Sequence, residues 1–101
     1  MKQDVFNRYA DKVVELFSID RDALFSKSKK RELVDARHLL YYLCSKRPMR
    51  VNYIQRYMSE NGYEITHSSI IHGINVMKRK MAEDPDYIKI VNKLNTSNYG
   101  N

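Results

Sequence analysis

Apolar residues recur every three or four positions through most of this 101-residue chain, and that spacing is typical of α-helices. The clearest case is the segment 65–81, where Ile70, Ile74, Met77 and Met81 fall on one side of a helix. Three glycines and two prolines are too few for the many turns of a β-sandwich. The pattern therefore predicts an all-α fold with five to six helices.

The same spacing indicates where the helices lie, and no linker or repeat divides the chain into a second domain. We expect a single domain over residues 1–101, with a polar, frayed tail at 95–101. The expected elements are a helix at 3–17, a loop with a helical turn at 19–25, a long helix at 29–45, a shorter helix from 51 to the Asn61-Gly62 exit, a helix at 66–80 and a last helix from 85.

Small polar residues mark the expected starts of two of these helices. Ser28 is expected to cap the helix at 29–45. Thr66, which precedes His67, Ser68 and Ser69, supplies a cap oxygen for the helix at 66–80 and places short hydrogen-bonding groups where backbone N–H groups attract anions. Ser68, His72, Asn75 and Arg79 form a polar stripe on another side of that helix. Because one side is apolar and another is polar, the helix could enter the major groove of DNA.

The positive charge is concentrated in the middle of the chain. The net charge is +6 overall, yet residues 27–80 carry twelve Lys/Arg against four Asp/Glu, a net charge of +8. Residues 1–26 and 81–101 each carry one more acid than base. A local basic excess of this kind is expected of a protein that binds a polyanion.

Three segments follow one another along the chain: a basic loop leading into a helix with an Ala-Arg pair at 26–43, a short helix at 54–62, and Thr-His-Ser-Ser-Ile-Ile-His-Gly at 66–73. In this order they resemble the C-terminal DNA-binding domain (domain IV) of the bacterial replication initiator DnaA, whose recognition helix begins Asp-His-Thr-Thr-Val-x-His-Ala. The likeness covers residues 13–81. It implies a Trp-repressor-like fold with a helix-turn-helix that binds duplex DNA.

The resemblance also implies a role for each matching residue. Lys29 matches an arginine that enters the minor groove, and His67 and Ser68 match residues that touch base edges in the major groove. Thr66, at the family's aspartate position, is expected to contact a base as well. The matching phosphate contacts are Arg37, Ser69 and His72. Further phosphate contacts are expected from the cations of the basic region, Lys27, Lys30, Arg31, Arg50, Lys78 and Arg79.

The chain departs from the family at several of these positions. Lys29 lacks the planar fork of arginine, and Ile65 stands where a basic residue is common. Gly73 replaces alanine, at a cost of roughly 1 kcal/mol in a helix unless close packing requires glycine. We therefore expect a duplex other than the initiator's usual site.

No Gly-x-x-x-x-Gly-Lys-Ser/Thr loop is present, so no ATPase module and no cofactor are expected. A stand-alone domain of this type suggests a small regulator of replication or transcription, encoded by a phage or another mobile element. The lone cysteine, Cys44, is expected in the core, and the start of the chain resembles no secretory signal. We expect a cytoplasmic protein that is associated with the nucleoid or, if it is encoded by a phage, lies in the host cytoplasm.

One of three other functions remains as an alternative for the same residues. Eight tyrosines, among them Tyr41, Tyr42, Tyr53, Tyr57 and Tyr63, are many for this length and favour a module that binds the host initiator or other replication proteins. A metal site is not expected, because His67 and His72 are five residues apart and no acid or cysteine completes the ligand set. An enzyme is not expected, because nothing supplies a pocket or an oxyanion site for Ser68, His72 and Glu64.

Overall fold

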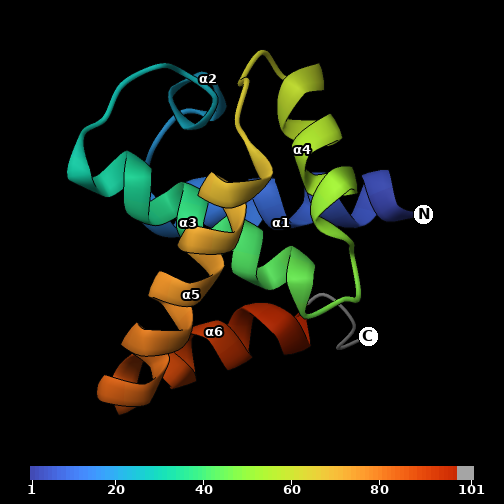
Figure 1. Ribbon diagram of the computed structural model, residues 1–101. Helices are drawn as coiled ribbons and strands as arrows, with labels where there is room; N and C mark the ends of the chain where they lie inside the picture. Colours follow the sequence, from blue (N-terminus) through green and yellow to red (C-terminus); the bar gives the residue numbers. More distant parts are fainter. Residues whose placement is uncertain (98–101) are drawn as a thin grey trace.

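The computed structural model describes the backbone of residues 1–97 and the side chains of residues 1–94, and within that range it is all-helical (Figure 1). This confirms the predicted fold class. The helices are α1 (Lys2–Phe17), α2 (Arg21–Leu24), α3 (Arg31–Ser45), α4 (Val51–Glu60), α5 (His67–Glu83) and α6 (Pro85–Ser97). No helix in this part of the chain is long and apolar enough to cross a membrane.

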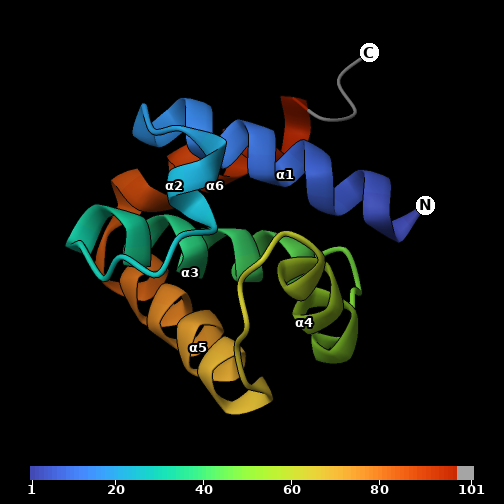
Figure 2. The same ribbon diagram turned by 90° about the horizontal axis from the view of Figure 1, so that it is seen from above.

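Helix α3 lies at the centre of the molecule, with α1 on one side of it and α5 on the opposite side (Figure 2). A helix packed on two sides must be apolar around most of its circumference. Leu39, Leu40 and Leu43 of α3 are accordingly fully buried, and so is Cys44, as its sequence context predicts. Because α3 is central, α5 packs directly against it.

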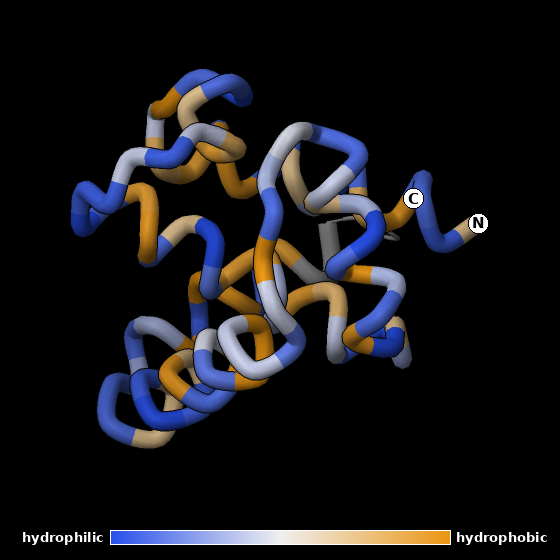
Figure 3. Tube along the Cα trace, turned by 45° about the horizontal axis from the view of Figure 1, so that its top comes forward, coloured by the Kyte–Doolittle hydropathy of each residue, from blue (hydrophilic) through white to orange (hydrophobic). Residues whose placement is uncertain are grey.

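Hydrophobic and hydrophilic stretches alternate along the outer helices, as expected for helices that bury one face (Figure 3). In α5 the predicted apolar stripe is confirmed: Ile70 and Met77 are fully buried, and Ile74 is 8 % exposed. Met81, at the far end of the stripe, packs half-buried against the same core. The apolar stripe thus fixes which side of α5 faces the solvent.

The segment 61–66 between α4 and α5 has the predicted ends. Gly62 has a φ of +89°, which glycine adopts without strain, and the Tyr63 N–H donates to the Met58 carbonyl at 2.9 Å. Thr66 caps α5, since its hydroxyl oxygen accepts from the Ser69 N–H at 3.1 Å. Both ends of this segment are therefore set by local residues.

Three predicted helix ends differ from the structure, and one of them is the end of α5, which continues to Glu83 rather than stopping at Lys80. Helix α3 begins at Arg31 rather than at Lys29, because the Ser28 hydroxyl does not cap it and instead accepts from the Lys30 N–H at 3.3 Å in the preceding turn. At the other end of the chain, α6 continues to Ser97, so residues 95–97 of the predicted tail belong to this helix. Residues 98–101 of the predicted tail lie outside the described residues.

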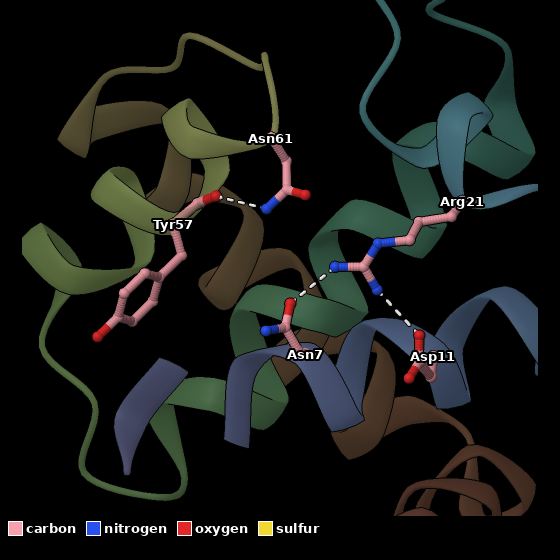
Figure 4. A network of polar contacts seen from close by, with 5 residues as sticks. All are labelled: Asn7, Asp11, Arg21, Tyr57 and Asn61. Atoms are coloured by element: carbon pink, nitrogen blue, oxygen red, sulfur yellow. Dashed lines mark hydrogen bonds and ion pairs between the residues drawn. The ribbon is translucent and has the colours of Figure 1, made fainter. Parts of the chain in front are cut away.

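Polar contacts fix α2 against α1. Arg21 of α2 donates to Asp11 at 2.9 Å and to Asn7 at 2.7 Å, both on α1 (Figure 4). On the other side of the same view, the Asn61 side chain donates to the Tyr57 carbonyl at 2.8 Å and closes the end of α4 (Figure 4). The Arg21 contacts fix α2, which leads into the loop at residues 25–30. The Asn61 contact fixes the start of the segment 61–66.

Gly73 lies where α5 crosses α3 most closely. A Cβ atom at this position would stand 2.7 Å from His38 Cδ2 and 3.0 Å from Tyr41 Cδ2, both in α3. Such a distance is well inside van der Waals contact. Close packing therefore requires glycine here, and it sets the depth at which α5 sits on α3.

Candidate nucleic-acid interface

An open groove of about 410 Å³ lies between three segments that are far apart in the sequence. We call it the loop–helix groove. It is bounded by the loop before α3 (residues 25–30, here the basic loop), by α3, and by the segment 61–66 with the first turns of α5. Its lining residues are Lys29, Val34, Arg37, His38, Tyr41, Tyr63, Glu64, Ile65, Thr66, Ser69 and His72. Four of the predicted site residues other than Arg37 thus share one concave surface.

The polar stripe of α5 faces the solvent beside this groove. Ser68, His72, Asn75 and Arg79, which share one side of the helix, are all exposed. His67, at the first position of the helix, is exposed as well. A long helix with one buried and one polar, exposed face is the shape that the major groove admits.

Cations of the basic loop stand on the opposite side of the groove. Lys27, Lys29 and Lys30 are exposed. The Lys29 ammonium donates to the Tyr63 hydroxyl at 3.3 Å and lies 5.7 Å from the centre of the Tyr63 ring. Because Tyr63 belongs to the segment 61–66, this contact brings the loop directly beside the start of α5.

Arg37 is placed differently from its predicted role as a phosphate contact. The residue is only 2 % exposed, and its guanidinium points into the protein. It donates to four backbone carbonyls, those of Leu24 at 2.7 Å, Ser26 at 2.7 Å, Ser28 at 2.8 Å and Ala23 at 3.4 Å. Four of the five N–H donors of the side chain are therefore used inside the protein, which disfavours a contact between Arg37 and a DNA phosphate.

The remaining predicted phosphate contacts are exposed but do not all gather at the groove. Arg31 begins α3 beside the basic loop. Lys78 and Arg79 lie eleven and twelve residues after His67 on α5, about 16–18 Å along the helix. Arg50 precedes α4 at the end away from the segment 61–66, about 15 Å off. Of the predicted phosphate contacts, only Arg37, Ser69 and His72 line the groove itself.

Six groove residues were not predicted as part of the site, and three of them, His38, Tyr41 and Tyr63, are aromatic. His38 and His72 meet edge to face with their ring centres 5.9 Å apart. Burial, and after it the charge of His72, lowers the pKa of His38 below its ordinary value, while Asp35 acts in the opposite direction. Burial also raises the pKa of Tyr41, so its hydroxyl stays neutral. Sequence spacing places His38 beside Arg37, but only the crossing of α3 and α5 brings it to His72.

The hydroxyl of Tyr41 and the Nδ1 atom of His38 have no hydrogen-bond partner among the described protein atoms. Both are buried behind the groove wall, where Gly73 allows α5 to come close. Buried polar atoms without a partner cost free energy, so the close crossing of α3 and α5 is achieved at the expense of two unpaired polar groups.

The tyrosines that favour a protein-interaction module are mostly interior. Tyr41, Tyr42, Tyr57 and Tyr63 are between 1 % and 8 % exposed, and Tyr53 is half-buried. Their aromatic area is used in the core, so among the described residues these five do not form an exposed aromatic surface. The structure thereby removes the main observation behind that alternative.

Comparison of the chain with known proteins identifies no family. No protein-family model, curated protein or solved structure matches the chain. The function is therefore argued from the site and from the resemblance of its motifs.

Proposed function

We propose that this protein binds double-stranded DNA, with α4, the segment 61–66 and α5 acting as a helix-turn-helix. The exposed face of α5 would lie in the major groove, where His67, Ser68 and Thr66 reach base edges. The basic loop would lie at the adjacent minor groove, with Lys29 as its anchor. The motif resemblance to the initiator's DNA-binding domain points to a small regulator of replication or transcription.

The observation that carries this proposal is the convergence of the basic loop and the start of α5 on one groove. Lys29 and Thr66 are 37 residues apart in the sequence, yet both line the same concave surface. The segments on either side carry exposed cations and short polar side chains. The segment 61–66 contains a single acidic residue, Glu64. A surface with cations to hold phosphates and small polar groups to reach bases has the two kinds of contact that sequence-specific binding needs.

The start of α5 adds a second source of attraction for phosphates. Thr66 caps only the Ser69 N–H, and the Ile70 N–H is bonded to the Thr66 carbonyl at 3.2 Å. The N–H groups of His67 and Ser68 point out of the first turn, where the helix dipole favours an anion. A DNA phosphate beside Ser69 and His72 would meet both this dipole and the nearby cations.

The test is the affinity for random duplex DNA across a series of salt concentrations. If roughly 5–8 phosphates are contacted, log K should fall against log salt with a slope of about −4.5 to −7. The variant Lys78→Ala should weaken binding to all sequences and make the slope shallower by about one phosphate contact. Lys89→Ala, which removes an exposed cation of α6 outside the basic region, is the matched control and should change neither quantity.

Selection of bound duplexes from a random pool then tests whether bases are read. His67→Ala or Ser68→Ala should alter the preferred sequence and weaken binding to the preferred site by about 1–3 kcal/mol. Equal losses on every sequence would show that α5 does not read bases. No binding of any duplex at low salt would contradict the proposal and return the protein-interaction module to first place.

A further inference from the structure

Arg37 has no part in the proposed DNA contacts, although it lies at the centre of the residues that would make them. Its charge is buried, and among the described side chains no carboxylate is paired with it. Burying a cation without a carboxylate partner costs free energy, and hydrogen bonds to neutral groups must offset that cost. The bonds of Arg37 go to the last two residues of α2 and to the basic loop, which carries Lys29.

The guanidinium uses all three of its nitrogen atoms on this segment. Nε donates to the Leu24 carbonyl, Nη1 to the Ser28 carbonyl, and Nη2 to the Ser26 carbonyl, each at 2.7–2.8 Å. These carbonyls belong to the end of α2 and to the basic loop, where no regular helix satisfies them. A planar fork with five N–H donors can hold three carbonyls in fixed directions, and a lysine ammonium cannot.

The other side of Arg37 faces the segment that leads into α5. The centre of its guanidinium, Cζ, lies 4.6 Å from the centre of the Tyr63 ring. Such a contact between a cation and an aromatic face is favourable, the more so away from water. The same tyrosine accepts a hydrogen bond from Lys29. Arg37 and Tyr63 therefore join the basic loop to the segment 61–66 through one buried contact and one surface contact.

We infer that Arg37 is a positioning residue that, together with Tyr63, holds the minor-groove anchor Lys29 at a fixed place relative to the reading end of α5. This inference rests on the proposed function. It replaces the phosphate contact that the resemblance implies for Arg37 with an internal role. A loop fixed before binding loses less conformational entropy when it meets DNA, so the arginine contributes to affinity without touching the ligand.

The first half of the test needs no DNA. Trypsin cleaves after lysine and arginine, and the basic loop offers Lys27, Lys29 and Lys30. In the wild-type protein the loop should resist cleavage, whereas in Arg37→Lys it should be cut about tenfold faster or more, because local opening exposes it. Cleavage after Lys46 or Lys78, measured in the same digest, reports any global loosening. The variant Val91→Ala, destabilised in the buried face of α6 and outside the loop–helix groove, is the control.

The second half is a double-mutant cycle with DNA. In the wild-type background Lys29→Ala should weaken binding by about tenfold, and in the Arg37→Lys background by less than about threefold, because the loop no longer presents residue 29. His67→Ala should cost the same factor in both backgrounds. A role of Arg37 in stability alone would leave the cost of Lys29→Ala unchanged.

Tyr63 supplies a second pair of variants should Arg37→Lys fail to fold. Tyr63→Phe keeps the ring over Arg37 and should leave the loop resistant to trypsin. Tyr63→Leu removes the ring and should speed loop cleavage and reduce the cost of Lys29→Ala.

The outcomes separate the inference from the proposed function. Equal costs of Lys29→Ala in all backgrounds, or a loop that stays resistant in Arg37→Lys, would overturn the positioning role. Failure of the wild-type protein to bind any duplex would overturn the proposed function and with it the DNA role of Arg37, and the digest would still report whether Arg37 holds the loop.

Discussion

The basic loop, residues 25–30, and the segment 61–66 both lead into a long helix and both border the loop–helix groove, but they are held in opposite ways. The segment 61–66 is held mostly by residues within or next to it: Gly62 at positive φ, the Asn61 side chain on the Tyr57 carbonyl, and Thr66 as a cap, with one further bond from Gln55 of α4 to the Ile65 carbonyl. The basic loop is held largely from outside, by Arg37.

This difference has a physical consequence for the two segments. A turn built from local residues forms with the helices that flank it, and it tolerates changes elsewhere in the fold. A loop whose carbonyls depend on one side chain of another helix takes its shape only when that helix is in place. The basic loop should therefore be more sensitive than the segment 61–66 to mutation of a distant residue.

Replacing Arg37 by alanine should have the largest effect on stability. It leaves the carbonyls of the basic loop without their donors and removes a buried side chain, so the free energy of unfolding should fall by about 3–4 kcal/mol. Urea unfolding measures this, with Lys27→Ala of the same loop as a control expected to change little. A loss below about 1 kcal/mol would mean that the loop does not depend on Arg37.

Gly73→Ala should come next. The added Cβ would lie 2.7 Å from His38 Cδ2, so α3 and α5 must separate or the imidazole must move, at a net cost of about 1–2 kcal/mol after the gain in helix propensity. Adding His38→Ala should recover much of this loss, because it removes the side chain in conflict. Gly62→Ala is a useful comparison: it has open space around it and should be strained only through its φ of +89°. If the double variant were no more stable than Gly73→Ala, the close approach of the helices would not be the cause.

Removing the cap of α5 should have a smaller effect. Thr66→Ala deletes the oxygen that accepts from the Ser69 N–H and should lower the free energy of unfolding by about 1 kcal/mol, while Thr66→Ser should retain most of it. Thermal unfolding followed by circular dichroism distinguishes the two. Equal losses in both variants would show that the methyl group, and not the hydroxyl, matters. Neither variant should speed trypsin cleavage of the basic loop, because the segment 61–66 is held locally.

The smallest effect is expected from pH. Burial and His72 lower the pKa of His38 below 6.5, so the folded state binds a proton less readily than the unfolded state. Stability should be complete above the unfolded value and should decline as the pH falls through 6.5 towards the lower folded value. Unfolding measured at about pH 7.5 and about pH 5.5 tests this, and His38→Gln should show a smaller decline than the wild-type protein. A decline of the same size in both would assign it to other groups.

Much of the fold follows from residues that are close in sequence. Apolar spacing predicts the helices and the buried stripe of α5, and Gly62 and Thr66 mark the ends of the segment between α4 and α5. The prediction for Ser28 is wrong because, unlike these, it is decided by a residue that is not close in sequence. A serine beside a lysine-rich stretch can cap a helix or a turn, and the choice between them depends on what holds the loop, which is Arg37 of α3.

Neighbouring residues are enough to show that this chain is helical, that its positive charge lies in its middle, and that α5 has one apolar and one polar face. The folded structure is needed to show that Arg37 points inward, that His38 and Tyr41 leave room only for glycine at position 73, and that Lys29 lies beside Tyr63. Each of these depends on side chains from helices that meet only after folding. A cation that reads as a DNA contact in the sequence is buried when backbone carbonyls from another segment surround it.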